Sequence, residues 1–361
     1  MPDQNAALEA LRKVMDPELR RDLVSLGMVK DLSAQGDTVS LQVELTTPAC
    51  PLKDRIGQDV RSALQGAGFK TVELRWGAQV RGAPGVAQSQ LTPGVKNIVL
   101  VGAGKGGVGK STVAVNIAVA LARMGAKVGI LDADIYGPSV PILTGLTERP
   151  TSRDGKKLDP LHAHGVEVMS IGFLIEPDQA LIWRGPMVTG ALVQLLRDVN
   201  WGELDYLVLD LPPGTGDIPL TLAQNVRAAG VVLVSTPQDV ALADVVRAKL
   251  MFDKVSIPVL GIVENMSSFV CPHCRKETDI FSHGGASQAA QKMGIPFLGE
   301  VPIDLAIREG GDRGTPIVAD QPDSPQSQAF FAVARNVAGA VSTQVLKAPR
   351  LPVIGGAQPR A

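Results

Sequence analysis

The sequence predicts an α/β protein with a mostly parallel, doubly wound sheet, preceded by a small α+β domain. From residue 96 onward, short apolar runs recur at 97–102, 127–132, 206–211, 230–237 and 259–266. Helical stretches such as residues 111–124 separate most of these runs. Continuous apolar strands between helices are typical of a parallel sheet that is covered on both faces.

The first 80 residues show a different pattern, in which strands alternate between apolar and polar residues. Val39, Leu41 and Val43 are separated by Ser40 and Gln42, which is the period of a half-buried strand. The expected elements are a helix over residues 4–15, a strand over 39–45, a helix from Pro51 and a strand over 71–76.

These patterns divide the chain into four parts. Residues 1–80 form the small domain, and the glycine- and proline-rich segment 81–95 is expected to be a linker because it has no periodicity. Residues 96–346 form the larger domain. Residues 347–361 are again rich in proline and glycine and are expected to be a flexible tail.

The composition excludes several classes of protein. With 45% hydrophobic and 20% charged residues, the chain of 361 residues has enough apolar material for a substantial core. A net charge of −1 and 4% aromatic residues give no general attraction to nucleic acid or anionic lipid. The N-terminus lacks a secretory pattern and the three cysteines make no disulfide framework, so we expect a cytoplasmic protein without nucleic-acid or membrane partners.

A glycine-rich segment between the strand 97–102 and the helix 111–124 matches the pattern G-x-x-x-x-G-K-[ST]. Its residues are Gly104, Lys105, Gly106, Gly107, Val108, Gly109, Lys110, Ser111 and Thr112. Successive backbone N–H groups of such a loop surround a phosphate at a helix N-terminus. Lys110 is expected to reach the β- and γ-phosphates, and the Ser111 hydroxyl to bind Mg²⁺. The alternative, a glycine-rich turn that matches by chance, does not require the flanking strand and helix.

Carboxylates at two strand ends complete this predicted ATP site. Asp210 ends the strand 206–211, where a carboxylate commonly holds the Mg²⁺ shell. Asp132 and Asp134 follow the strand 127–132, next to the phosphate loop if the two strands are neighbours. Asp134 is a candidate to orient the attacking water, and a plain turn or helix-cap carboxylate is the alternative.

The segment Cys271-Pro272-His273-Cys274 contains a thiolate pair of the kind that binds soft metals. A zinc site or a [4Fe–4S] cluster needs four ligands, and the simplest way to obtain four is to combine two chains across a two-fold axis. A thioredoxin-like redox pair and a structural role are alternatives, and spacing alone does not separate zinc from an iron–sulfur cluster.

The extra Lys105 makes the loop resemble that of the MinD/ParA group of ATPases. Four further segments narrow the resemblance to the Mrp/ApbC-type iron–sulfur cluster carrier proteins: DADIYGPSVP at 132–141, DLPPGTGD at 210–217, ENMSSFVCPHC at 264–274 and VPID at 301–304. The small domain is similar to one often fused ahead of these carriers, through DPE at 16–18, LGMV at 26–29 and TTPACP at 46–51.

This resemblance implies a homodimer that binds ATP, Mg²⁺ and a [4Fe–4S] cluster, hydrolyses ATP slowly and transfers the cluster to apoproteins. It also implies that Lys105 reaches the partner's nucleotide, that Asp134 and Asp217 lie in switch regions, and that Asn265 contacts the adenine beside the segment 302–304. From the residues alone, Asn265 is equally well explained as a turn former.

A positioning or partitioning ATPase of the MinD/ParA kind, with the cysteine pair as a structural zinc clasp, is the alternative function. A reductase like the nitrogenase iron protein ranks below it. Cys50 has two interpretations: a small core residue, or an acidified thiol that transiently holds iron near a helix N-terminus. His162, His164 and His283 show no ligand spacing and are interpreted as surface or loop residues.

Overall fold

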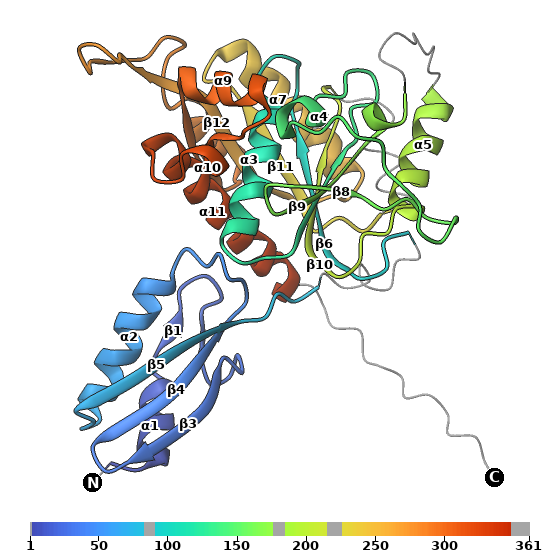
Figure 1. Cartoon of the computed structure of the whole chain (residues 1–361). Helices are drawn as coiled ribbons and strands as arrows, with labels where there is room; N and C mark the ends of the chain where they lie inside the picture. Colours follow the sequence, from blue (N-terminus) through green and yellow to red (C-terminus); the bar gives the residue numbers. More distant parts are fainter. Residues whose placement is uncertain (1, 83–90, 176–184, 215–225, 348–361) are drawn as a thin grey trace, which may run out of the picture.

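The computed structural model describes residues 2–82, 91–175, 185–214 and 226–347, which form a small N-terminal domain and a larger α/β domain (Figure 1). The elements of the small domain are α1 (Gln4–Leu11), β1 (Met15–Asp16), β2 (Arg21–Asp22), β3 (Val29–Gln35), β4 (Thr38–Leu45), α2 (Lys53–Gly66) and β5 (Thr71–Ala78).

The central strand of the small domain, β4, buries its apolar residues on one face, as its alternation predicts. Strand β3 pairs antiparallel with β4, and β5 pairs parallel with it. Helix α2 covers the sheet with Ile56, Val60 and Leu64, which are spaced four residues apart and fully buried. The sequence analysis missed β3, whose polar residues Lys30, Asp31 and Ser33 hide its alternation.

The larger domain begins with β6 and ends with a long helix. Its first elements are β6 (Val95–Gly102), α3 (Lys110–Arg123), β7 (Val128–Asp132), α4 (Val140–Thr144), β8 (Leu161–Ala163), β9 (Val166–Ser170), the 3₁₀ turn η1 (Ile171–Phe173), α5 (Gly185–Arg197) and β10 (Leu204–Asp210). They are followed by β11 (Gly230–Ser235), α7 (Asp239–Lys254), β12 (Val259–Val270), β13 (Glu277–Thr278), α8 (Gly285–Met293), β14 (Phe297–Ile303), α9 (Leu305–Arg313), α10 (Ile317–Asp320) and α11 (Pro325–Lys347).

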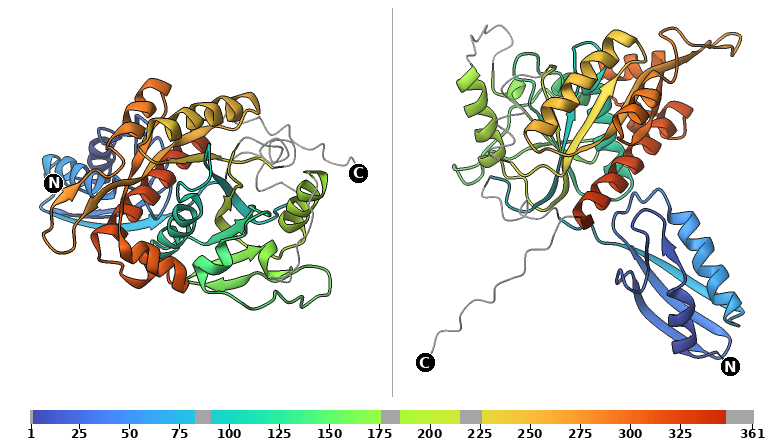
Figure 2. Two further views of the ribbon diagram at one scale, coloured as in Figure 1. Left: turned by 90° about the horizontal axis from the view of Figure 1, so that it is seen from above. Right: turned by 180° about the vertical axis from the view of Figure 1, so that it is seen from behind.

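The described strands of the larger domain form one sheet in the order β13-β12-β11-β6-β10-β7-β9-β8, with β14 also paired to β12. All pairs are parallel except β12–β13 and β8–β9. The two remaining views show helices on both faces of this sheet (Figure 2). The predicted fold class, a mostly parallel doubly wound sheet behind a small α+β domain, is confirmed.

Four strands of the large sheet were not predicted, and one of them, β13, has only two residues. Strands β8 and β9 are short and interrupted by the histidine-containing turn at residues 164–165, and β14 contains a glycine and a glutamate. Strand β12 is also longer than predicted, because it continues through the polar residues Ser267 and Ser268 to Val270.

Helix α11 is the one helix in the described part of the chain that is long and apolar enough to cross a membrane. The helix packs against α3 and β14, and it buries Phe330, Val333, Val337 and Val341 in the core of the larger domain. Its apolar character is therefore explained by that core.

The two domains meet below the large sheet. The Tyr206 hydroxyl donates a hydrogen bond of 3.0 Å to Thr47 Oγ1, and Ala49 is buried in the core of the larger domain. A segment of the small domain thus completes the lower end of β10, and the carboxyl end of the same strand carries Asp210.

Candidate functional site: a phosphate loop and a cysteine hairpin

The phosphate loop lies between β6 and α3 and depends on glycine for its shape. Gly107 and Gly109 have left-handed backbone angles, with φ of +82° and +80°. Gly104 has no space for a side chain, because a Cβ atom there would lie 2.6 Å from the Cβ of Asp244 in α7. The loop is therefore held between α3, which follows it, and α7, which packs against Gly104.

A cavity of about 730 Å³ opens over this loop. The predicted site residues that line it are Lys105, Gly106, Gly107, Gly109, Lys110, Ser111, Thr112, Asp134 and Asn265. Gly104, Val108 and Asp210 are not among the lining residues. The volume is in the range of pockets that hold small molecules or nucleotides.

Lys110 and Asp210 form a buried ion pair at the base of the cavity. Lys110 Nζ lies 2.6 Å from Asp210 Oδ1 and also donates to Ser111 Oγ at 3.1 Å. Burial raises the pKa of Asp210, and the ammonium group of Lys110 opposes this shift. Asp210 Oδ2 is buried and accepts no hydrogen bond from any described residue. This free oxygen is suited to a Mg²⁺ ion or to one of its water ligands.

Asp132 and Asp134 differ in their roles. Strand β7 is not adjacent to β6, because β10 lies between them. Asp132 is fully buried and accepts hydrogen bonds from the backbone of Asp134 and Val140 and from the Ser170 hydroxyl, so it organises the turn. Burial and the nearby Asp210 carboxylate raise the pKa of Asp132 to about 7. Asp134 lines the cavity. Partial burial raises its pKa, although the positive charge of Lys110 acts in the opposite direction.

Asn265 connects the cavity to strand β12. Its Nδ2 donates a hydrogen bond of 2.8 Å to the carbonyl of Val108 in the phosphate loop. The next residue, Met266, has a left-handed backbone with φ of +60°, at a point where the pairing of β12 with β14 shifts register. Asn265 therefore fixes the loop, and it also lines the cavity beside the segment 302–304 that the resemblance assigns to the base pocket.

The cysteine pair lies at the tip of a hairpin formed by β12 and β13. Phe269 pairs with Thr278 and Val270 with Glu277, so residues 271–276 form the turn. Hydrogen bonds close this turn: Cys271 N–H donates to the Lys276 carbonyl at 3.0 Å, and Arg275 N–H donates to the Cys271 carbonyl at 2.8 Å. Backbone N–H groups of Cys274 and His273 lower the pKa of Cys271, since they stabilise its thiolate.

Of the two interpretations of Cys50, a core residue or an acidified thiol, the structure does not support the acidified thiol. It is half-buried against the core of the small domain, and burial raises its pKa to about 11. The helix that follows begins only at Lys53, so its N-terminus does not offset the loss of hydration. Cys50 is therefore explained as a packing residue.

His283 is an exposed loop residue, as predicted, but its spacing along the chain does not show that it has a carboxylate partner. His283 Nε2 lies 2.9 Å from Glu300 Oε2, and Glu264 is close to both. His162 also has a carboxylate partner, Glu167, at 3.3 Å. These contacts come from strand pairing and loop positions that spacing along the chain does not reveal. Asp217, which the resemblance places in a switch region, lies outside the described residues.

Sequence reasoning missed the second wall of the cavity. Ile142 of α4 and Ile307 and Arg308 of α9 line it opposite the phosphate loop. The short amphipathic helices that carry these residues have no motif, and only the contact between α4 and α9 brings them together.

Comparisons with known proteins show which family this chain belongs to. A family model described as NUBPL iron-transfer P-loop NTPase matches residues 94–338, and a model of the iron–sulfur cluster assembly protein matches residues 4–73. The iron–sulfur cluster carrier protein of Deinococcus radiodurans is 52% identical, over 97% of this chain and 99% of its own length. That of a Synechocystis species is 48% identical, over 95% and 99%.

Solved structures give the same fold. A nucleotide-binding protein from Archaeoglobus fulgidus, described in complex with ADP and with cobalt, is 43% identical with a TM-score of 0.57. The match covers 66% of this chain and 92% of that one. The cell-division ATPase MinD of Pyrococcus furiosus, at 24% identity and a TM-score of 0.51, covers 67% of this chain and 98% of its own, and it shares the fold alone.

The phosphate loop, the hairpin with its cysteine pair and the near full-length similarity lead to one assignment: the chain belongs to the iron–sulfur cluster carrier proteins, a family of P-loop NTPases with the MinD/ParA fold.

Proposed function

We propose that this protein binds and slowly hydrolyses ATP, holds a [4Fe–4S] cluster between two copies of the chain, and transfers that cluster to apoproteins. The observation that carries this proposal is the position of the cysteine pair. Cys271 and Cys274 lie at the tip of an exposed hairpin, and among the described residues no other cysteine is near them. One chain offers two thiolates, so two chains are needed for the four ligands of a cubane cluster.

The nucleotide half of the proposal depends on the cavity over the phosphate loop. Lys110 is placed to neutralise the β- and γ-phosphates from within its own chain, and Asn265 and the segment 302–304 to contact the base. Mg²⁺, held through Ser111 and the free oxygen of Asp210, would neutralise phosphate charge. Asp134 is placed to orient the water that attacks the γ-phosphate.

Lys105 has a different role in this proposal. It lines the cavity but makes no ion pair with a described residue, unlike Lys110. A cation that the described part of its own chain leaves unpaired is available to a nucleotide on the partner chain. Charge supplied across an interface in this way increases phosphoryl transfer by about 10³–10⁵-fold in related systems.

Strand β12 supports a link between the two halves. It contains Asn265, which is bonded to the phosphate loop, and it leads directly to Cys271, six residues further along. Six fully extended residues would span about 20 Å, and the left-handed backbone of Met266 shortens this path. A change in loop geometry that moves Asn265 is therefore passed to the hairpin through one continuous element.

The test is anaerobic reconstitution of the full chain with ferrous iron and sulfide, followed by iron analysis, mass measurement and transfer to an apo-acceptor. We expect four iron atoms per two chains and recovery of acceptor activity. A cluster that forms with four irons on a single chain would contradict the shared site. ATP-dependent sedimentation with liposomes or DNA, without cluster transfer, would favour a positioning or partitioning ATPase instead.

A further inference from the structure

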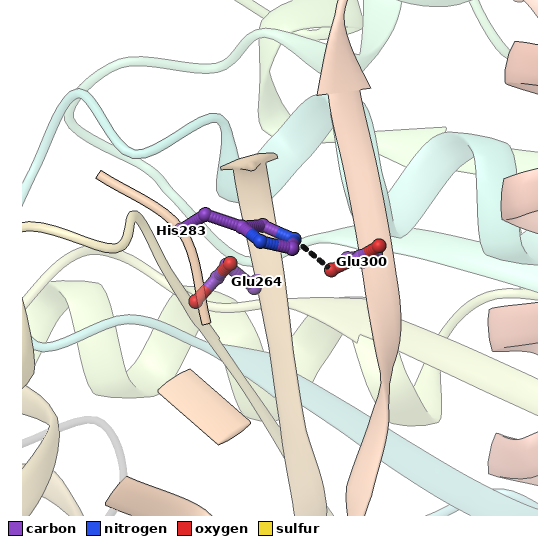
Figure 3. A group of neighbouring side chains, drawn as sticks. All are labelled: Glu264, His283 and Glu300. Carbon is purple, nitrogen blue, oxygen red and sulfur yellow. Dashed lines mark hydrogen bonds and ion pairs between the residues drawn. The ribbon is translucent and has the colours of Figure 1, made fainter. Parts of the chain in front are cut away.

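A second group of metal-ligating side chains lies at the base of the cysteine hairpin. Glu264 of β12, Glu300 of β14 and His283, which precedes α8, converge on one point (Figure 3). One ligand atom from each side chain lies within 4.8 Å of the other two. Glu264 and Glu300 face each other in the parallel pairing of the two strands, and His283 Nε2 is 2.9 Å from Glu300 Oε2.

Helix capping accounts for only part of this arrangement. Glu264 is fully buried and its two carboxylate oxygens accept from the backbone N–H groups of Gly284 and Ala286, at 2.9 and 2.7 Å. Capping does not explain why a second carboxylate, that of Glu300, stands directly opposite on the next strand. Two neighbouring carboxylates disfavour each other's charged form, and a cation between them would remove this repulsion. Each carboxylate oxygen also keeps a lone pair after one hydrogen bond.

The donor set indicates which cation fits. One imidazole and two carboxylates are ligands of borderline divalent metals such as Zn²⁺, Fe²⁺ and Co²⁺, whereas Mg²⁺ prefers oxygen ligands alone. A tetrahedral ion with bonds of about 2.1 Å needs ligand atoms about 3.4 Å apart, which small rotations of these side chains provide. The side chains of His283 and Glu300 are 46% and 48% exposed, so a fourth position is open to solvent.

We propose that Glu264, His283 and Glu300 bind one divalent transition-metal ion per chain, at a site separate from Cys271 and Cys274. With three protein ligands and one open position, the site would exchange its ion readily. A bound ion would connect the segment between β13 and α8, which contains His283, to both β12 and β14. The same segment is already attached to β12 through the hydrogen bond from the Gly284 N–H to Glu264. This inference does not depend on cluster binding or on ATP hydrolysis.

The test uses zinc chloride and the full chain with Cys271→Ser and Cys274→Ser, so that the hairpin thiolates cannot contribute. Competition with a chromogenic chelator should show one Zn²⁺ per chain. Adding His283→Gln or Glu300→Gln should weaken binding by more than about tenfold, since even changes outside the ligand shell cost 10–100-fold. The matched control is His162→Gln, which removes the other exposed histidine–glutamate pair, where no third ligand is present among the described residues.

Thermal unfolding provides a second measurement that does not depend on the chelator. Zinc that binds only the folded state should raise the Tm of the Cys271→Ser/Cys274→Ser protein. The same concentration should leave the Tm unchanged after His283→Gln. Failure of the Cys271→Ser/Cys274→Ser protein to bind zinc, or equal binding after His283→Gln, would overturn the proposal. Equal weakening by His162→Gln would do the same.

Discussion

The phosphate loop and the cysteine hairpin are built in opposite ways. Around the loop, charges and hydrogen bonds are paired within one chain: Lys110 with Asp210, and Asn265 with the carbonyl of Val108. At the hairpin tip, hydrogen bonds within the turn satisfy the backbone and stabilise the Cys271 thiolate, but Cys274 is exposed. A site that binds its ligand in one chain can be prepared in advance. A site that must release its cargo is better left incomplete until two chains meet.

The strongest test of this contrast removes the thiolates. We expect Cys271→Ser with Cys274→Ser to abolish cluster binding, because hydroxyls then replace both of the soft ligands that each chain would supply. ATP affinity should stay within about twofold of the parent. Iron content and nucleotide affinity are measured on the same preparation. Cys50→Ser is the control and should retain the full iron content, and a cluster that survives the double substitution would show that the ligands lie elsewhere.

Replacing each of the two loop lysines by alanine should affect ATP binding and ATP hydrolysis differently. Lys105→Ala should retain most of the ATP affinity and lose hydrolysis by about 10³-fold or more, because its charge would act only when two chains close on nucleotide. Lys110→Ala should lose ATP binding itself. Nucleotide titration and steady-state turnover separate the two effects. Hydrolysis at the parent rate in Lys105→Ala would mean that the nucleotide site is complete within one chain.

Lys110→Ala should also destabilise the nucleotide-free protein, in a pH-dependent manner. Removing one partner of a buried ion pair costs about 3–5 kcal/mol when the other charge remains. Burial raises the pKa of Asp210 above its unfolded value, so in the variant the folded state takes up a proton that the unfolded state has lost. Stability should therefore fall as the pH rises, and the Tm deficit should be smaller at pH 5 than at pH 8. A deficit that is equal at both values would contradict this ionisation.

The smallest expected effect compares two glycines of the loop. Gly104→Ala should cost about 1–3 kcal/mol, because the added Cβ overlaps Asp244. Gly106→Ala is the matched control, since its Cβ would meet nothing nearer than Pro213 at 4.0 Å. Urea denaturation of both variants measures the difference. Equal stability would show that the loop moves freely against α7.

The sequence predicted the position of the phosphate loop between a strand and a helix, because its residues are consecutive and their positions follow from one strand, one turn and one helix. It also predicted that Asp210 lies at a strand end beside that loop. The strand order was not accessible, so the separation of β7 from β6 by β10 appears only in the structure. The Glu264–His283–Glu300 group was missed for the same reason. It depends on which strands pair and in which register, and that is decided by packing of the whole sheet.

The hydrogen bond from Tyr206 to Thr47 has a consequence for dividing this protein into parts. The chain passes from one domain to the other between β5 and β6, but residues 47–49 belong physically to the larger domain. A fragment that begins at residue 91 would leave the Tyr206 hydroxyl without its partner and would expose the apolar surface that Ala49 covers. The two domains are separate along the sequence, but the small one shields part of the larger one from water. Removing the small domain would therefore expose a new surface at the end of the central strands of the larger domain.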